Sequence, residues 1–180
     1  MVLDPWWDAA LVGVLGLMVG SFLNVVIYRL PKMMDEAWAI EAEAYRQKDN
    51  PDWLSPSPQI SLSRPASRCG HCGHGIRWYE NIPVLSWLFL RAKCSACKTP
   101  ISWRYPLIEL LTGALFAYSA WRFGVSLAML AWCVFSALVV ALFWIDWDTT
   151  FLPDSLTQPL LWLGLMLAML GFNPLVERFS

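Results

Sequence analysis

Charge is scarce in this sequence and unevenly placed. Only 15% of its 180 residues are Asp, Glu, Lys or Arg, and residues 9–28, 125–145 and 156–172 carry no charge at all. No Lys or Arg precedes Arg29, so the start lacks the basic region of a cleavable signal peptide, and we expect none. Hydrophobic residues make up 57% of the chain, whereas ordinary soluble domains contain about 45–50%. This composition excludes an ordinary soluble domain.

The uncharged stretches predict an all-α protein that crosses a membrane several times. A helix needs roughly 17 to 25 apolar residues to span the bilayer core, and each of these stretches is about that long. A fourth, shorter stretch contains Glu109 about one turn from its start. We expect Glu109 either to pair with a nearby arginine such as Arg104 or to take part in catalysis. The sequence therefore predicts about four transmembrane helices, at residues 9–28, 106–122, 125–145 and 156–172.

The first predicted span has features of close helix packing. Three glycines recur at helical spacing, which favours the close approach of another helix: Gly13, Gly16 and Gly20. Ser21 and Asn24 are its polar exceptions, and we expect both to form helix–helix hydrogen bonds. Arg29 and Pro31 are expected to end the helix.

Residues 29–104 form one long polar loop between the first and second spans. The loop contains eleven basic and seven acidic residues, which leaves a net charge of +4. Its acidic residues 35–52 indicate a short amphipathic helix, and the Pro- and Ser-rich residues 50–65 indicate an extended connector. Basic residues near the ends of the spans favour the cytoplasmic side. We therefore expect a cytoplasmic loop and a periplasmic N-terminus.

Two CxxC pairs, separated by 21 residues, lie in the basic part of this loop: Cys69-Gly-His-Cys72 and Cys94-Ser-Ala-Cys97. Four thiolates at this spacing predict a structural zinc ribbon over residues 69–97, whose closed site has no open position for water. Two disulfides are the alternative, although they rarely persist in a reducing compartment. His71 or His74 could replace one ligand, but four cysteines make this unnecessary. Cys133 lies in mid-span and is expected to be a small buried hydrophobic residue.

The positive charge of the ribbon has two explanations. Residues 53–104 carry seven basic residues against Glu80 alone. Retention beside anionic lipid of the inner leaflet is the explanation we prefer, because each Lys or Arg contributes about 1 kcal/mol there. Trp78 and Tyr79 beside this charge also fit a weak nucleic-acid-binding pattern. We expect membrane lipid as a partner and no nucleic acid.

Three carboxylates occur in residues 146–155, at the mouth of a predicted helical hairpin: Asp146, Asp148 and Asp154. An ionisable group in this position invites a functional interpretation, because an Asp at a membrane-helix centre costs about 2.5–3.5 kcal/mol. Asp148 and Asp154 are equally explained as solvated turn residues, with Asp154 capping the next helix. Asp146 directly follows the apolar run and is the preferred functional residue.

The combined motifs resemble those of the bacterial type IV prepilin peptidases. The resemblance covers nearly the whole chain apart from the acidic insert, and its segments are residues 16–31, 67–72, 78–87, 94–97, 100–109, 145–146 and 152–157. It implies a polytopic aspartic peptidase of the bacterial inner membrane, acting in pilus assembly or type II secretion. Such enzymes cut the basic leader from prepilins and pseudopilins at the cytoplasmic face. Many also N-methylate the new terminus with S-adenosylmethionine, for which the sequence shows no glycine-rich nucleotide loop.

By this resemblance Asp146 is the first catalytic aspartate, and Asp148 and Asp154 match accompanying positions that the family does not all require. The family's second catalytic aspartate follows a Gly-x-Gly motif on a later helix, and no such motif with an Asp follows Phe151 in this sequence. Asp148 is a poor substitute. We therefore expect a fragment or a truncated product that is inactive alone. The alternative is a non-catalytic membrane scaffold whose zinc ribbon binds a secretion or pilus-assembly partner.

Overall fold

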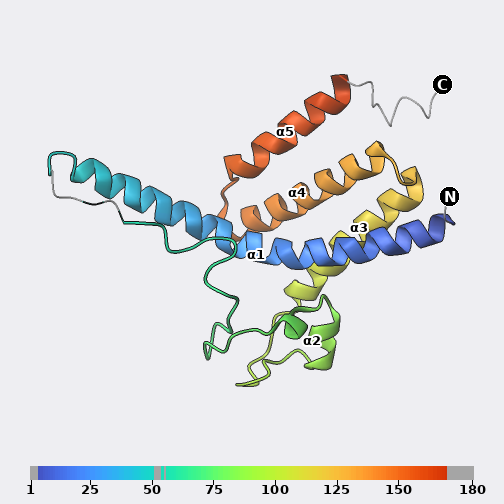
Figure 1. The fold of residues 1–180 in the computed structure, drawn as a ribbon, viewed down its shortest axis with the longest axis horizontal. Helices are drawn as coiled ribbons and strands as arrows, with labels where there is room; N and C mark the ends of the chain where they lie inside the picture. The colour runs from blue at the N-terminus through green and yellow to red at the C-terminus, as the bar shows by residue number, and fades with distance from the viewer. Residues whose placement is uncertain (1–3, 51–53, 55, 170–180) are drawn as a thin grey trace.

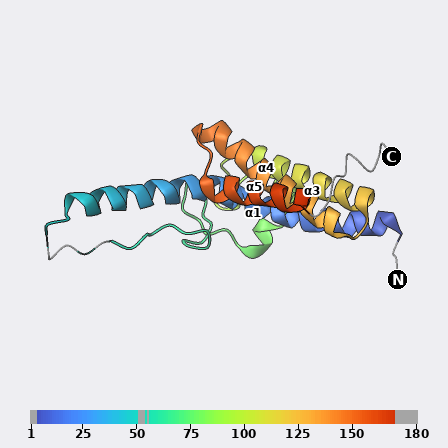
Figure 2. The same ribbon diagram turned by 90° about the horizontal axis from the view of Figure 1, so that it is seen from above.

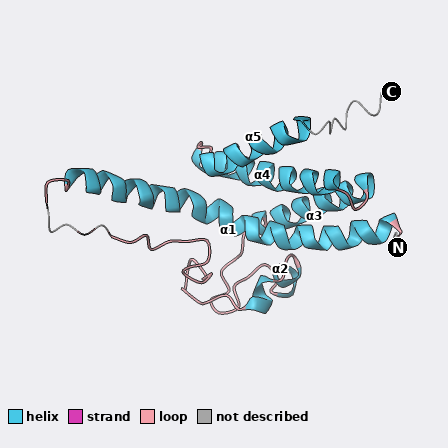
Figure 3. Ribbon diagram, turned by 45° about the horizontal axis from the view of Figure 1, so that its top comes forward, coloured by secondary structure: helices cyan, strands magenta, loops and turns pink. Residues whose placement is uncertain are grey.

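The computed structural model describes residues 4–50, 54 and 56–169, which fold into helices and loops. Four long helices form a bundle: α1 (Pro5–Arg46), α3 (Arg104–Phe123), α4 (Leu127–Thr149) and α5 (Asp154–Met169). A loop region beside the bundle holds the 3-10 helix η1 (Trp78–Asn81) and the short helix α2 (Leu85–Phe89) (Figure 1). No β-strand occurs among the described residues, as Figure 3 shows, so the predicted all-α fold is confirmed for them.

Helix α1 runs without interruption over 42 residues and extends well beyond the bundle (Figure 1). The prediction that the first helix ends at Arg29 and Pro31 is therefore wrong. Pro31 removes one main-chain hydrogen bond, but the residues after it are rich in Met, Ala and Glu, which are strong helix formers. The acidic amphipathic helix predicted at residues 35–52 is thus the continuation of α1 as far as Arg46.

Helices α1 and α3 pack in close contact through small residues. A Cβ atom on Gly16 would lie 2.7 Å from the Cβ of Phe116, and one on Gly20 would lie 2.7 Å from the Cα of Glu109. The close helix approach predicted from the glycines is therefore confirmed, with α3 as the partner. Asn24 also donates a hydrogen bond of 3.2 Å to the main-chain oxygen of Tyr105, as predicted for a polar residue of this span.

The core lies where three helices meet, and its buried residues are Leu23, Ile27, Ile108, Val140, Ala141 and Ile145. Ile108 and Ile145 have no exposed surface. Because Ile145 immediately precedes Asp146, this packing fixes the end of α4 that carries the predicted carboxylates. Cys133 is also buried in α4, as expected. Helix α5 packs against α4 (Figure 2). None of the described residues of α5 is buried.

Two of the described helices, α1 and α4, are long and apolar enough to cross a membrane. The most apolar stretch of 18 residues has a mean hydropathy of 2.3 in α1 and 2.4 in α4.

The connector from α1 to the ribbon returns along the α1 extension. Arg29 donates hydrogen bonds to the main-chain oxygens of Ser61 (2.9 Å) and Pro65 (2.6 Å). The carboxylate of Glu36 accepts bonds from the main-chain amides of Gln59 (2.8 Å) and Ile60 (3.0 Å). These bonds hold the connector that leads to the ribbon against α1.

Candidate functional site

The segment predicted as an aspartate loop, residues 146–155, is mostly helical. Asp146 and Asp148 lie in the last turn of α4, Asp154 begins α5, and only residues 150–153 connect them. Thr150 ends α4 in the left-handed conformation, with φ of 53°, and its amide donates a bond of 2.7 Å to the main-chain oxygen of Asp146. A residue in this conformation is a common helix C-terminus, so α4 ends just after the carboxylates.

Asp146 has an exposed side chain at the end of α4. No hydrogen-bond or ion-pair partner for its carboxylate occurs in the described part of the chain. Its carboxylate is therefore held by the helix alone and is accessible to water, a substrate or a second carboxylate.

Asp148, two residues later, is held by an arginine of α3. The guanidinium of Arg104 donates two hydrogen bonds to its carboxylate oxygens, of 2.8 and 2.6 Å. The same guanidinium lies 4.5 Å from the ring centroid of Trp144. Asp148 is therefore not a free turn residue, and Asp146 is the unpaired carboxylate of the two.

This ion pair replaces the one expected between Arg104 and Glu109. Residues five apart on one helix lie on different faces, because α-helical neighbours are three or four apart. Glu109 instead accepts a 2.7 Å hydrogen bond from the main-chain amide of Val84, and its Cα lies close to Gly20 of α1. Glu109 is only 7% exposed and joins three elements: α1, α3 and the ribbon.

Asp154 is the first residue of α5 and is exposed. A carboxylate in the first turn of a helix interacts favourably with the helix dipole. The connector before it contacts the α1 extension, because the rings of Trp38 and Phe151 meet edge to face with centroids 5.4 Å apart. No feature of the sequence indicated this contact, which depends on α1 continuing beyond Pro31.

The four cysteines of the two CxxC pairs come together, and their sulfur atoms all lie within 4.8 Å of one another. The sulfurs of Cys69 and Cys97 are 3.8 Å apart. Tetrahedral zinc with Zn–S bonds of ~2.3 Å requires sulfurs about 3.8 Å apart, so the cluster fits this metal. All five cysteines are free, so the alternative of two disulfides is wrong for this structure. His74 is directed elsewhere, with Nε2 3.8 Å from a carboxylate oxygen of Glu80.

The two CxxC segments have the same main-chain hydrogen bonds, at an offset of 25 residues. The amide of Cys69 donates to the oxygen of His74 (2.8 Å), and the amide of Cys94 donates to the oxygen of Thr99 (2.9 Å). Each turn also contains a residue with positive φ four positions after its first cysteine, Gly73 (70°) and Lys98 (60°). At this offset the two segments share the cysteines, a preceding basic residue (Arg68 and Lys93), an isoleucine (Ile76 and Ile101) and a tryptophan (Trp78 and Trp103).

Without a metal, the four thiols of this cluster do not all ionise equally, because the pKa of some is lowered and that of another is raised. The side chain and amide of Thr99 lower the pKa of Cys97 to about 5, and the amide of Cys72 lowers the pKa of Cys69. The amide of His74 favours ionisation of Cys72, but the sulfur of Cys97, burial, and the sulfurs of Cys69 and Cys94 together outweigh it and raise the pKa of Cys72 to about 11. A divalent cation would remove this competition, because all four sulfurs could then be thiolates.

Comparison with known proteins agrees with the geometry. A family model described as the bacterial peptidase A24 N-terminal domain matches residues 14–123, and a second, the type IV leader peptidase family, matches residues 133–179. A prepilin leader peptidase/N-methyltransferase from Neisseria gonorrhoeae is 48% identical over 97% of this chain and 60% of its own length. One from Stutzerimonas stutzeri is 50% identical over 91% of this chain and 56% of its own length.

A relative of the same name from Burkholderia pseudomallei is 52% identical over 88% of this chain and 51% of its own length. The chain thus spans about half to 60% of the length of these curated relatives. No solved structure matches the chain. Both family models together cover most of the sequence, so the chain belongs to the bacterial type IV leader peptidase (A24) family.

Proposed function

We propose that this chain forms the part of a membrane aspartic endopeptidase that carries the first catalytic carboxylate. The complete enzyme would cut the leader from type IV prepilins or pseudopilins at the cytoplasmic face of the bacterial inner membrane. The observation that carries this proposal is the free, exposed carboxylate of Asp146 on a helix end fixed by Ile145 in the core. The membership of the family supports the same role.

In this proposal Asp146 shares one proton with a second aspartate. That aspartate is expected after a Gly-x-Gly motif, in the part of the relatives that this chain does not span. Two close carboxylates cannot both ionise, so one is charged and the other protonated. The charged one takes a proton from the attacking water, and the protonated one donates to the oxygen of the scissile carbonyl. Asp148 does not serve as the second carboxylate, because Arg104 binds both of its oxygens.

The proposed topology has four spans, with the N-terminus in the periplasm and the ribbon in the cytoplasm. The apolar helices α1 and α4 support membrane insertion, and the basic residues of the loop support its cytoplasmic location. Asp146 then lies at the cytoplasmic boundary. A substrate whose apolar stem lies in the bilayer and whose basic leader lies in the cytosol presents its cleavage site at that depth.

We also propose a structural zinc ion in the ribbon, with Cys69, Cys72, Cys94 and Cys97 as its ligands. Four thiolates close the site, so the metal folds the loop and leaves no position for a reactant. The groove between α3 and α4 does not match the chemistry of the methyl donor. It is lined mainly by apolar side chains such as Tyr118, Phe123 and Trp132, with no carboxylate to bind a ribose. We assign no residue to S-adenosylmethionine.

A chimera tests the peptidase proposal. In the Neisseria gonorrhoeae relative, the matched segment is replaced by this chain, and cleavage of a type IV prepilin is followed in membranes. We expect the chimera to cleave, the chain alone not to cleave, and Asp146→Asn to abolish cleavage. Asp154→Asn, an exposed aspartate eight positions away, is the matched control and should keep most of the activity. Cleavage by the chain alone would contradict both the proposal and the scaffold alternative. Cleavage by the Asp146→Asn chimera would show that Asp146 is not catalytic and would favour the scaffold function.

A further inference from the structure

We propose that helix α2 lies in the cytoplasmic headgroup layer of the membrane, with one apolar face inserted among the lipid chains. The inference deepens the proposed topology and rests on it, but it does not depend on peptidase activity. It assigns a specific lipid-binding surface to the ribbon, beyond the general attraction of its positive charge to anionic lipid.

The surface is one face of α2. Leu85, Leu88 and Phe89 are spaced at i, i+3 and i+4, so they share a side of the helix. They are 50%, 57% and 83% exposed, whereas the intervening Trp87 points inward and donates a 3.3 Å hydrogen bond from Nε1 to the oxygen of Ile101. The helix therefore has a covered side and an uncovered apolar side, as interfacial helices do.

The depth of α2 is fixed by its attachment to α3. The amide of Val84, which immediately precedes α2, donates its 2.7 Å bond to Glu109, the sixth residue of α3. Val84 has φ of 58°, a conformation that β-branched residues rarely adopt, so the fold maintains this turn against local strain. Figures 1 and 3 show α2 beside the first turns of α3 and not beside the α1 extension.

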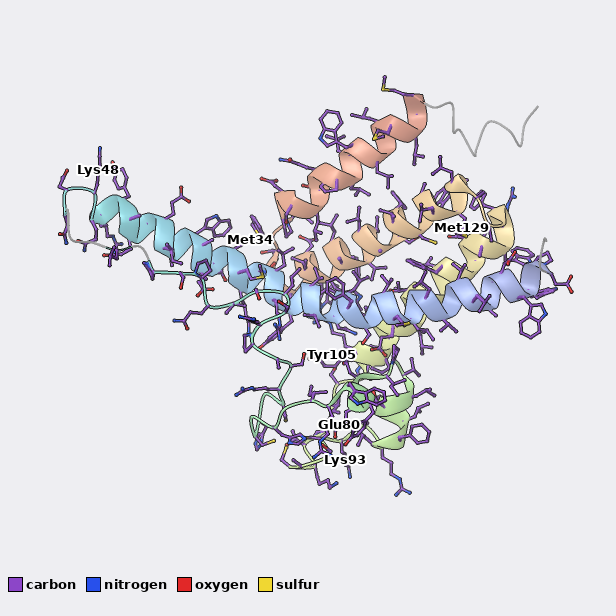
Figure 4. The ribbon with its side chains drawn as sticks, in the orientation of Figure 1. Met34, Lys48, Glu80, Lys93, Tyr105 and Met129 are labelled. Atoms are coloured by element: carbon purple, nitrogen blue, oxygen red, sulfur yellow. The ribbon has the colours of Figure 1, made fainter. Side chains whose placement is uncertain are left out.

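The occupant of this surface follows from its neighbours. The first two turns of α3 also expose apolar side chains, Leu107, Leu110 and Leu111, which face lipid in the proposed topology. Exposed Arg91 and Lys93 follow α2 directly. Figure 4 shows Lys93 on the side of the ribbon away from α1 and Tyr105 between the ribbon and the bundle. Apolar residues followed by cations match the acyl chains and anionic headgroups of the inner leaflet.

Photocrosslinking tests the inference on the full 180-residue chain in nanodiscs of phosphatidylethanolamine and phosphatidylglycerol. Phe89 is replaced by p-benzoylphenylalanine, a mild change at an exposed aromatic residue, and lipid adducts are measured by mass spectrometry. Leu110, 52% exposed on α3, is the membrane control, and Tyr45, 81% exposed on the α1 extension, is the aqueous control. Leu88 serves as a second test position. Unchanged metal content shows that each variant retains the ribbon.

We expect lipid adducts at positions 88 and 89 in yields comparable with position 110. We expect none at position 45. Adducts at position 110 without any at 88 and 89 would overturn the inference and leave the proposed topology intact. Crosslinks from 88 or 89 to protein alone would identify another chain or segment as the occupant and would also overturn it. Absence of lipid adducts at position 110 as well would contradict the α3 span and the inference together.

Discussion

Arg104 at the start of α3 binds both carboxylate oxygens of Asp148 in the last turn of α4, at 2.8 and 2.6 Å. The two residues are 44 positions apart in the sequence. Asp146 lies on the same turn of α4 and has no such partner among the described residues. The ion pair therefore fixes the helix end without occupying the carboxylate that we assign to catalysis.

A double-mutant cycle measures this ion pair. Arg104→Gln and Asp148→Asn should each lower the free energy of unfolding, and the coupling between them should be about 1 kcal/mol. Partial exposure of both side chains, at 29% and 34%, keeps the coupling small, whereas the bidentate geometry puts it at the upper end of the range for exposed pairs. Thermal unfolding in detergent gives the four stabilities. Arg104→Gln with Asp154→Asn is the control pair, for which we expect no coupling. A coupling of zero for Arg104 and Asp148 would contradict the structural role of the pair.

The sequence predicted the features that depend on composition and spacing. Runs without charge predicted the helices, glycines at helical spacing predicted the contact of α1 with α3, and the CxxC spacing predicted the sulfur cluster. The features it missed are tertiary. Several acidic residues could have formed the ion pair with Arg104, and only the packing of α4 against α3 brings Asp148 to it. Glu109 accepts a hydrogen bond from a main-chain amide. Because nearly every residue has such an amide, the residue type does not reveal which one is bound.

The continuation of α1 through Pro31 was missed for a different reason. A proline inside a helix costs about 3 kcal/mol, which is a sound local argument for an end. In the structure this cost is offset by helix-forming residues on both sides of Pro31. It is also offset by tertiary contacts that cannot be predicted from the sequence, such as that of Trp38 with Phe151. The span that leads to Asp146 was predicted from the sequence, but the continuation of α4 to Thr149 and the contact of the following connector with the α1 extension were not.

Removal of one ribbon cysteine should remove the metal. Cys72→Ser and Cys97→Ser are each expected to reduce bound zinc from about one per chain to near zero and to expose the ribbon to trypsin, because the loop has no core of its own. Metal analysis and limited proteolysis measure both effects. Cys133→Ala, a cysteine buried in α4, is the control and should keep its zinc. Equal protease resistance of the serine variants, and of the wild type after chelation, would argue against a structural zinc.

The equivalent turns of the ribbon allow a test of backbone strain. Gly73 and Lys98 occupy matching positions with φ of 70° and 60°, but only glycine adopts this conformation readily. Lys98→Gly should therefore stabilise the ribbon by about 0.5–1 kcal/mol, and Gly73→Ala should destabilise it by a similar amount. The chelator concentration that removes half of the zinc should rise in the first variant and fall in the second. Shifts in the same direction would show that the turns are not equivalent in solution.

Glu109 should attach the ribbon to the bundle through its acceptor oxygens and not through its charge. Glu109→Gln keeps an oxygen for the Val84 amide, whereas Glu109→Leu leaves that buried donor unpaired at a cost of about 1–3 kcal/mol. Hydrogen exchange measured by mass spectrometry should become faster for residues 84–90 in the Leu variant and stay near the wild-type rate in the Gln variant. Residues 93–100, whose turn is closed by its own hydrogen bonds, should exchange equally in all three proteins and serve as the internal control. Unchanged exchange of residues 84–90 in the Leu variant would show that α2 stays in place without Glu109, and its depth would then have to be set by Trp87 and Ile101.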